Sequence, residues 1–268
     1  MIMENKLRFS ILASGSTGNA TYIETPHQKI LVDAGLSGKK LEESMNLLGK
    51  TLADVDKLLV THEHSDHIKG VGVIARRYNL EVFADQKTWT KIEPKIGQLS
   101  IAQKSIFETG KTKTFDDIDV FSFAVSHDAI APQFYGFYYE GKKFVIATDT
   151  GKVDEKLEKT IADADAYLIE CNHDEDMLQN GWYPWSLKQR IAGEKGHLSN
   201  DSSAKVLTKV IGANTKRIYL GHLSEKNNKK ELAKATVAKY LMENEFAVGH
   251  DFWLCDTDPS KPTALVEL

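Results

Sequence analysis

Cysteine is scarce in this sequence: Cys171 and Cys255 are the only two among 268 residues. They are far apart and lack the paired spacing of a zinc ribbon or of a disulfide framework. Folds stabilised by several disulfides or by a structural cysteine-zinc site are therefore excluded. This cysteine usage fits a reducing compartment best, so we expect a cytoplasmic protein.

Long hydrophobic runs are also missing. No segment approaches the roughly 20 apolar residues that a membrane-spanning helix needs. Residues 1–10 lack the basic start and the long apolar run of a signal peptide. We expect neither secretion nor membrane insertion.

An excess of positive charge is absent as well, because 34 Lys and Arg residues face 38 Asp and Glu residues, a formal net charge of -4. A polyanion would therefore have to be held by a local patch or by bound cations, which weighs against a plain nucleic-acid-binding module. Hydrophobic residues at 41% and charged residues at 27% are ordinary for a globular protein. The length predicts one α/β domain spanning residues 1–268.

Short β-prone runs alternate with segments of helical apolar spacing along the whole chain. The first block has strands at 7–13, 20–24 and 29–33, which form an opening β-meander, then helices at 36–48, 66–78 and 85–92 with strands at 57–61 and 80–84. A second β-rich block has strands at 106–108, 113–115, 120–126, 133–140 and 143–148. The last part has helices at 154–161, 201–210 and 229–243 with strands at 166–170 and 217–220. Two β-rich blocks predict two sheets with helices layered on them.

The segment 61–67, Thr-His-Glu-His-Ser-Asp-His, places four potential metal ligands directly after an apolar strand. At a turn from strand to helix, His62 and His64 can point one way while Asp66 and His67 point to a neighbouring position. Imidazole suits zinc, manganese or iron, and the carboxylate adds charge to hold a second divalent ion. A chance cluster is the alternative, but the chain has only nine histidines and a loop cluster has no packing use.

Three further candidate ligands each follow a predicted buried strand: His127, Asp149 and His222. Taken singly, His127 could be a surface residue and Asp149 a helix or turn cap. Loops at the strand ends of α/β sheets converge, which would bring these side chains together. We expect His127 to bind the first metal, Asp149 to bridge both, and His222 to complete the second shell.

The order of these motifs resembles the metal motifs of the metallo-β-lactamase superfamily. The segments 14–19, 170–173 and 196–200 resemble the YycJ family, also called WalJ or VicX, within that superfamily. The resemblance implies an α/β fold, the metallo-β-lactamase αββα four-layer sandwich, with two mixed β-sheets flanked by helices. It assigns His62, His64 and His127 to one metal and Asp66, His67 and His222 to the other, with Asp149 between them.

Other residues receive expected roles near this centre. His197 resembles the non-ligand histidine of phosphodiesterases in the superfamily, so we expect it to donate a proton or to contact phosphate; a solvent-facing loop histidine is the alternative. The loop of Gly15 and Gly18 could approach a phosphate, or form a plain turn. The expected substrate-binding residues are Ser16, Asn19 and Asn200, and the expected catalytic residues are His197, Asp149 and Asp66. His27, His173 and His250 are expected to be structural or exposed.

Two surface features leave alternatives open. A cationic patch of Lys226, Lys229, Lys230, Lys234 and Lys239 could meet a phosphate backbone, although a solvated helix face explains it equally well. Trp182, Tyr183 and Trp185 could stack on bases, although aromatic residues that anchor a long loop are commoner.

Two metal ions roughly 4 Å apart would lower the pKa of a shared water and supply a bridging hydroxide for hydrolysis. The His/Asp ligand set resembles the nuclease and thioesterase branches of the superfamily. The interval from Asp149 to His222 is too short for the inserted domain of β-CASP nucleases, and too few residues follow His222 for the helical domain of glyoxalase II.

The family resemblance therefore implies a 5′-to-3′ exonuclease of double-stranded DNA, with two Zn, Mn or Fe ions as cofactors. It also implies a functional link to a cell-wall two-component system. The alternatives are a hydrolase of a small thioester, lactone or cyclic phosphodiester, and a non-catalytic regulatory partner.

Overall fold

The computed structural model describes residues 6–268. Two expectations therefore fall partly on residues outside the described part. These are the absence of a signal peptide at residues 1–10 and the start of the single domain over residues 1–268. Among the described residues, no helix combines the length and the apolar character that crossing a membrane requires.

Within residues 6–268 the strands form two seven-stranded sheets. The first sheet has the order β14 (Val266–Glu267), β1 (Arg8–Ala13), β2 (Ala20–Glu24), β3 (Lys29–Val32), β4 (Lys57–Leu59), β5 (Glu81–Ala84), β6 (Lys104–Ile106). The second has the order β13 (Trp253–Asp256), β12 (Arg217–Gly221), β11 (Ala166–Glu170), β10 (Lys142–Ala147), β9 (Gln133–Tyr139), β8 (Ile118–Ala124), β7 (Thr112–Phe115).

Each sheet is mixed, as expected. β1, β2 and β3 form the antiparallel meander, and β3 to β6 run parallel. In the second sheet β7 to β10 are antiparallel and β10 to β13 are parallel. The carboxyl ends of the parallel strands in a sheet meet at one edge, and this edge carries the side chains described below.

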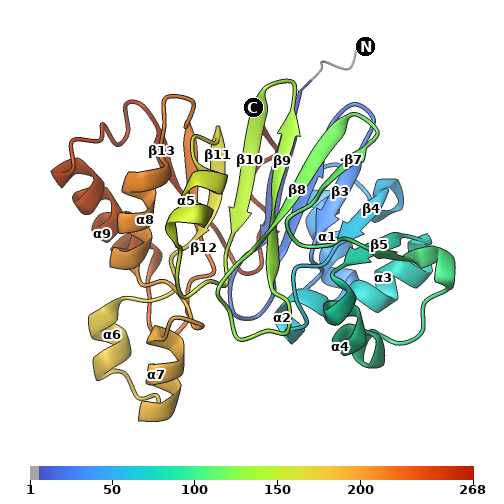
Figure 1. The fold of residues 1–268 in the computed structure, drawn as a ribbon, viewed down its shortest axis with the longest axis horizontal. Helices are drawn as coiled ribbons and strands as arrows, with labels where there is room; N and C mark the ends of the chain where they lie inside the picture. The colour runs from blue at the N-terminus through green and yellow to red at the C-terminus, as the bar shows by residue number, and fades with distance from the viewer. Residues whose placement is uncertain (1–5) are drawn as a thin grey trace.

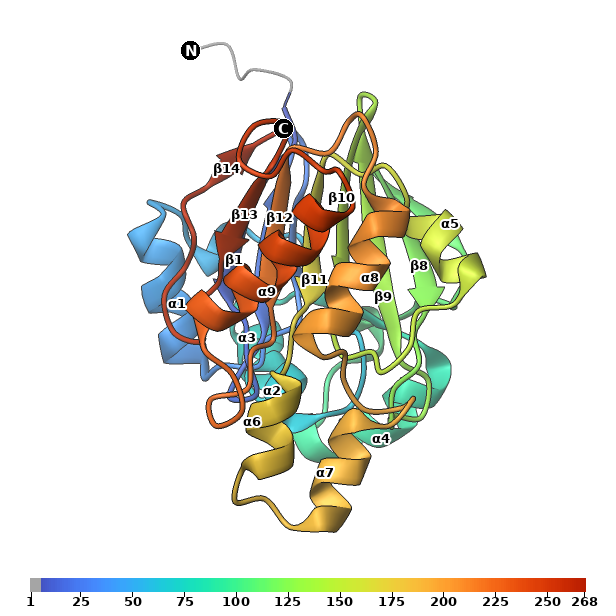
Figure 2. The ribbon, with the colours of Figure 1, turned by 90° about the vertical axis from the view of Figure 1, so that its left-hand side faces the viewer.

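Helices cover the outer faces of the two sheets, which gives the expected four layers (Figure 1). The first sheet is covered by α1 (Gly38–Leu47), α3 (Val71–Tyr78) and α4 (Gln86–Ile96), with α2 (Ser65–Ile68) at its edge. The second is covered by α5 (Glu155–Ile161), α8 (Asn200–Val210) and α9 (Lys230–Glu243). The helices α6 (Glu175–Asn180) and α7 (Trp185–Ala192) project beyond the sheets instead (Figures 1 and 2).

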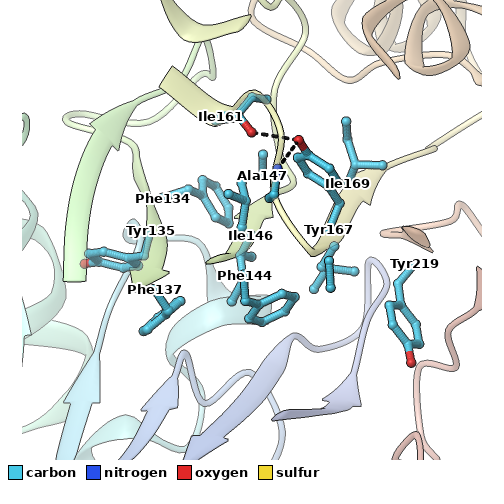
Figure 3. Packing of buried hydrophobic residues seen from close by; sticks show 14 of the residues in the cluster. Phe134, Tyr135, Phe137, Phe144, Ile146, Ala147, Ile161, Tyr167, Ile169 and Tyr219 are labelled. Atoms are coloured by element: carbon cyan, nitrogen blue, oxygen red, sulfur yellow. Dashed lines mark hydrogen bonds between the residues drawn. The ribbon is translucent and has the colours of Figure 1, made fainter. Parts of the chain in front are cut away.

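The core follows from strand alternation. Ile30 and Val32 pack between the sheets, whereas Leu31 packs against the outer helices. Phe9 of the first sheet stacks on Phe144 of the second, with ring centroids 4.0 Å apart. Aromatic side chains of β9, β10 and β11 extend this cluster (Figure 3). The two sheets are therefore held face to face by apolar contact, which fixes the position of their common edge.

The sequence-based boundaries differ from the structure at several elements. The helix expected over 66–78 is two helices in the structure. They are separate because the Gly70 N–H donates to the Ala34 carbonyl at 2.7 Å instead of to a carbonyl within the helix. The strand expected at 106–108 lies two residues earlier, in β6. α6, α7, β13 and β14 were not expected, and α4 continues past residue 92 to Ile96.

Candidate metal centre

All seven candidate ligands lie at one edge of the sandwich, on the segments that follow strands, with Asp66 and His67 on the short helix α2. Segment 61–67 follows β4, His127 follows β8, Asp149 follows β10 and His222 follows β12. A cavity of about 250 Å³ opens there and is lined, among other residues, by His64, Asp66, His127, Asp149, His197 and His222. Strands of both sheets thus supply one site.

The first group consists of His62, His64 and His127. One ring nitrogen from each of these histidines lies within 4.8 Å of one from each of the other two. Nε2 of His127 lies 3.3 Å from Nδ1 of His64. His62 is fully buried beneath them. Three imidazoles that converge in this way match the ligand set of a divalent transition metal.

The second group consists of Asp66, His67 and His222. Oδ2 of Asp66 lies 3.5 Å from Nε2 of His67 and 3.6 Å from Nε2 of His222. Asn19 supports this group, since its amide nitrogen lies 3.2 Å from Oδ2 of Asp66. A carboxylate with two imidazoles gives this group the charge that a second divalent cation needs.

The Asp149 carboxylate lies between the two groups. Its Oδ2 is 3.3 Å from Nε2 of His67, and its Oδ1 is 3.0 Å from Nδ1 of His222. On the other side, Oδ1 is 3.9 Å from Nε2 of His127. One carboxylate therefore reaches side chains of both groups, which is the geometry that a bridging ligand requires.

Three residues at this edge have a strained backbone conformation. Asp33, Asp149 and His222 have φ angles of 59°, 49° and 53°, in the left-handed region that non-glycine residues seldom adopt. Local hydrogen bonds hold this conformation: the His222 N–H, for example, donates to Oγ of Ser14 at 2.8 Å. Such strain persists only where the surroundings impose it, and it is often found at functional sites.

The polar atoms at the centre fit divalent metal ions. Among the described residues, Nε2 of His62, Oδ2 of Asp149 and Nε2 of His222 are buried without a hydrogen-bond partner. A buried polar atom without a partner costs roughly 1–3 kcal/mol, so three such atoms among the candidate ligands need an explanation. Coordination to a cation would satisfy all three, and imidazole and carboxylate are suitable donors for it.

The electrostatics favour the ligand forms in the first group. Burial holds the pKa of His62 well below the usual histidine value, and burial also lowers the pKa of His127. Burial raises the pKa of Asp149, but His222 and His67 outweigh it and bring that pKa well below its usual range. Neutral imidazoles and an ionised bridging carboxylate are the forms that bind metal.

Two buried carboxylates behind the ligands were missed in the sequence. Oδ2 of Asp33 lies 2.7 Å from Nδ1 of His67, and Oε1 of Glu170 lies 3.0 Å from Nδ1 of His222. Such partners orient a ligating imidazole and increase its basicity. Each is a lone acidic residue at or just after the end of an apolar strand, the same signal that identified Asp149, and could have been found by it.

His197 lines the cavity, and its side chain is 20% exposed, so the alternative of a solvent-facing loop histidine does not describe it. Its Nδ1 lies 2.7 Å from Oε1 of Glu170, which leaves Nε2 available. Burial lowers the pKa of His197, but Glu170 more than compensates and raises it overall. An imidazole with a raised pKa beside a metal centre can deliver a proton.

The three expected substrate-binding residues differ in their surroundings in the structure. Ser16 lines the cavity. Asn19 is 7% exposed, and its side chain bonds both the N–H and the carbonyl of Gly15. Asn200 is fully buried, and its side chain bonds Asn228. The positions of Asn19 and Asn200 therefore suit support of the loops rather than contact with a substrate.

The loop of Gly15 and Gly18 forms a closed turn. The Gly15 N–H donates to Oδ1 of Asn19 at 3.0 Å, and the Gly18 N–H donates to the Gly15 carbonyl at 3.1 Å. Both amides are thus used within the turn, which favours the plain turn over a phosphate-binding loop. Of the remaining histidines, His27 and His250 are exposed and His173 is buried.

The lysine patch is partly neutralised. Lys230 pairs with Asp258 at 2.8 Å, and Lys234 lies 3.8 Å from Asp256. These ion pairs favour the interpretation of the lysine patch as a solvated helix face. The aromatic residues behave differently: Trp182 and Trp185 are 75% and 62% exposed, so they do not anchor a loop by burial.

Comparison with known proteins shows the family of this chain. A model of the metallo-beta-lactamase superfamily matches residues 13–222. The chain is 51% identical over 263 residues to the exodeoxyribonuclease WalJ of Streptococcus pneumoniae serotype 2. This match covers 97% of this chain and 98% of that relative. It is 50% identical over 259 residues to the exodeoxyribonuclease YycJ of Bacillus anthracis, with the same two coverages.

Solved structures agree at the level of the fold. The metallo-beta-lactamase fold protein YhfI from Bacillus subtilis superposes with a TM-score of 0.70, covering 96% of this chain and 99% of that one, at 12% sequence identity. So low an identity supports the shared architecture alone. The four-layer fold and the family resemblance expected from the sequence are both confirmed.

Proposed function

The chain belongs to the metallo-β-lactamase superfamily, and from this premise we propose that it is a dinuclear metal-dependent exonuclease that shortens double-stranded DNA from its 5′ ends. The observation that carries the DNA assignment is the 50–51% identity, over nearly the whole chain, to two proteins named exodeoxyribonucleases. The clustered histidines and aspartates are the matching chemistry on this chain.

In this proposal His62, His64 and His127 hold one divalent ion, and Asp66, His67 and His222 hold the other. Asp149 bridges them, which the position of its carboxylate between the two groups supports. When bound, the ions supply Lewis acidity toward the phosphate and lower the pKa of the attacking water. Zinc and manganese suit these ligands best, and iron is compatible with them.

The second part of the mechanism belongs to His197 and Glu170. The leaving oxygen of a phosphodiester needs a proton, and His197 supplies it from Nε2. Glu170 accepts the Nδ1 proton of His197 in a hydrogen bond of 2.7 Å and stabilises the charged imidazole. Asp66 and Asp149 act by fixing the reaction centre, since each carboxylate lies beside two or more imidazoles.

We further propose that the protein acts in the cytoplasm, in a functional link with a cell-wall two-component system. Both cysteines are free, as expected in a reducing compartment. The link to the two-component system rests on the resemblance to the YycJ family.

The test combines metal analysis with end-labelled substrates. The purified chain is loaded with zinc or manganese, its metals are counted by mass spectrometry, and double-stranded DNA, single-stranded DNA and RNA are each offered with a label at either end. We expect two metals per chain and progressive loss of DNA from its 5′ end. Asp149→Ala should lose both metals and activity, whereas the exposed Asp119→Ala, remote from the cavity on β8, should retain both.

Each other outcome points elsewhere. Metal binding without cleavage of any nucleic acid would favour a hydrolase of a small thioester, lactone or cyclic phosphodiester. Retention of both metals by Asp149→Ala at unchanged affinity would refute the bridge. Absence of metal from the unmutated chain would leave a regulatory partner as the better hypothesis.

A further inference from the structure

The helical arm, defined as α6, the turn 181–184 and α7, is not explained by the sheets or by the metal centre. It projects from the end of the sandwich at which α2 also lies (Figures 1 and 2). Every residue of α7 is at least partly exposed to solvent. A helix without a buried face contributes little to the core, so its presence calls for another use.

Polar contacts connect the arm to the surroundings of His127 and to the backbone of His197. Nε of Arg190, on α7, lies 2.6 Å from Oδ2 of Asp128, whose Oδ1 lies 3.5 Å from Nε2 of His127. At the end of α7, the Ile191 carbonyl accepts the N–H of His197 at 2.8 Å. The position of the arm is therefore fixed relative to the residues that would perform the reaction.

The inner side of the arm forms part of the cavity wall. Tyr183, Leu187, Arg190 and Ile191 line the cavity together with the candidate ligands. Tyr183 contacts Trp182 edge to face, with ring centroids 5.0 Å apart. A continuous surface thus leads from the metal centre through Tyr183 to Trp182 at the tip.

The outer part of this surface is aromatic and exposed. Trp182 and Trp185 have 75% and 62% of their surface in solvent, although indole rings are costly to leave in water. Exposed aromatic side chains beside a nucleic-acid channel stack on bases, and the stack tolerates any base because each has a π-face. The side chain of Arg190, 63% exposed between tip and cavity, adds a cation for a phosphate.

We propose that the helical arm is a stacking platform, on which Trp182 and Trp185 hold the bases of the DNA strand whose scissile phosphate lies at the metal centre. The proposal rests on the exonuclease function proposed above. α7 is about 12 Å long, which corresponds to roughly three base steps of stacked DNA. The platform would therefore hold the terminal nucleotides and place the phosphate next to them over the metals.

The test is the double variant Trp182→Ala/Trp185→Ala, assayed on DNA and on a small chromogenic phosphodiester, bis(p-nitrophenyl) phosphate. We expect the KM for DNA to rise at least about fivefold, with kcat and the hydrolysis of the small substrate unchanged. Trp182→Phe/Trp185→Phe should restore most of the DNA affinity, because phenyl rings also stack. A purely structural role would not separate the two substrates.

Trp253→Ala is the matched control. Trp253 is 53% exposed, but it pairs with Arg217 at the start of β12, the opposite end of that strand from His222. Its loss should leave the KM for DNA unchanged. A second control changes the substrate: abasic nucleotides at the 5′ end should raise the KM of the wild-type chain, and should add little further to that of the double alanine variant.

Each result decides the matter. An unchanged KM in the double alanine variant, or a wild-type chain indifferent to abasic ends, overturns the platform and leaves the exonuclease standing. If the alanine variant fails to fold, the abasic substrate still tests the platform with the wild-type chain. A wild-type chain that hydrolyses the small phosphodiester but not DNA overturns both proposals. A dimer that dissociates in the variant, with unchanged KM, would assign the aromatic residues to a second copy of the chain.

Discussion

Glu170 accepts a hydrogen bond from His197, with Oε1 2.7 Å from Nδ1, while the same oxygen lies 3.0 Å from Nδ1 of His222. One fully buried carboxylate thus holds both the candidate proton donor and a candidate metal ligand. Burial raises the pKa of Glu170, but His197 and His222 bring it down to about 2, so the group is ionised at neutral pH. This carboxylate couples the two halves of the proposed mechanism.

The first prediction follows from that coupling. Glu170→Gln keeps the size of the side chain and removes its charge, so kcat on DNA should fall about 10- to 100-fold. Glu170 raises the pKa of His197, so without its charge the alkaline limb of the pH-rate profile should move to lower pH. The exposed Glu194→Gln serves as control. An unchanged limb would show that Glu170 does not act through His197.

A second prediction concerns protons released on metal binding. Burial lowers the pKa of His222, but neighbouring carboxylates, Asp149 foremost, raise it to about 10 in the metal-free chain. The pKa of His67 is also raised. The His222 imidazole is therefore charged at pH 7, and binding of a metal ion by its nitrogen must displace about one proton.

The sign of the pH dependence follows. Because the pKa of His222 lies near 10, metal affinity should rise as pH rises from 7 toward about 10, and should weaken on acidification. Titration calorimetry in two buffers with different ionisation enthalpies measures the proton count directly. Metal binding without proton release at pH 7 would contradict the charged state of His222.

The sequence allowed the ligands to be predicted because their signal is local. His62 to His67 lie within six positions, and His127, Asp149 and His222 each follow an apolar strand that the residue pattern identifies. Convergence of strand ends at one edge then brings them together. Their roles as metal ligands stay predictions that the metal analysis tests.

Glu170 and Asp33 carry the same local signal as Asp149, a carboxylate at the end of an apolar strand, but their roles depend on contacts with His222 and His67, which are far away in the sequence. α7 was missed for a different reason: with every residue partly exposed, it lacks the apolar stripe by which a helix is identified. β14 was missed because it is stabilised by pairing with β1, where Phe9 faces Val266 from the far end of the sequence. Such long-range partners leave no local pattern.

A third prediction tests the core. The Tyr167 hydroxyl accepts from the Ala164 N–H at 2.9 Å and lies 2.8 Å from the carbonyl oxygens of Ile161 and Val210 (Figure 3 shows the contact with Ile161). Tyr167→Phe would leave buried backbone groups without a partner and should lower the free energy of unfolding by about 1–3 kcal/mol. Urea denaturation measures this change. Tyr138→Phe, at a partly exposed position, should cost less than about 0.5 kcal/mol.

The last prediction concerns the close approach that positions the second metal group. A Cβ added at Gly35 would lie 1.7 Å from the Asp66 carbonyl oxygen and 2.5 Å from the Asn19 nitrogen. Both neighbours are backbone atoms that cannot rotate away, so Gly35→Ala must displace α2, which carries Asp66 and His67. Overpacking of this kind costs about 1–3 kcal/mol, and metal content should fall with it.

Gly49→Ala is the control for this change. Gly49 has a φ of 67° but no atom within 4 Å of the added Cβ, so alanine there carries conformational strain without a clash. Its metal content should equal that of the wild-type chain, although its stability should fall by about 1 kcal/mol. Equal metal loss in both variants would mean that general destabilisation empties the site; loss in Gly35→Ala alone would show that the contact between Gly35 and Asp66 holds the second group in place.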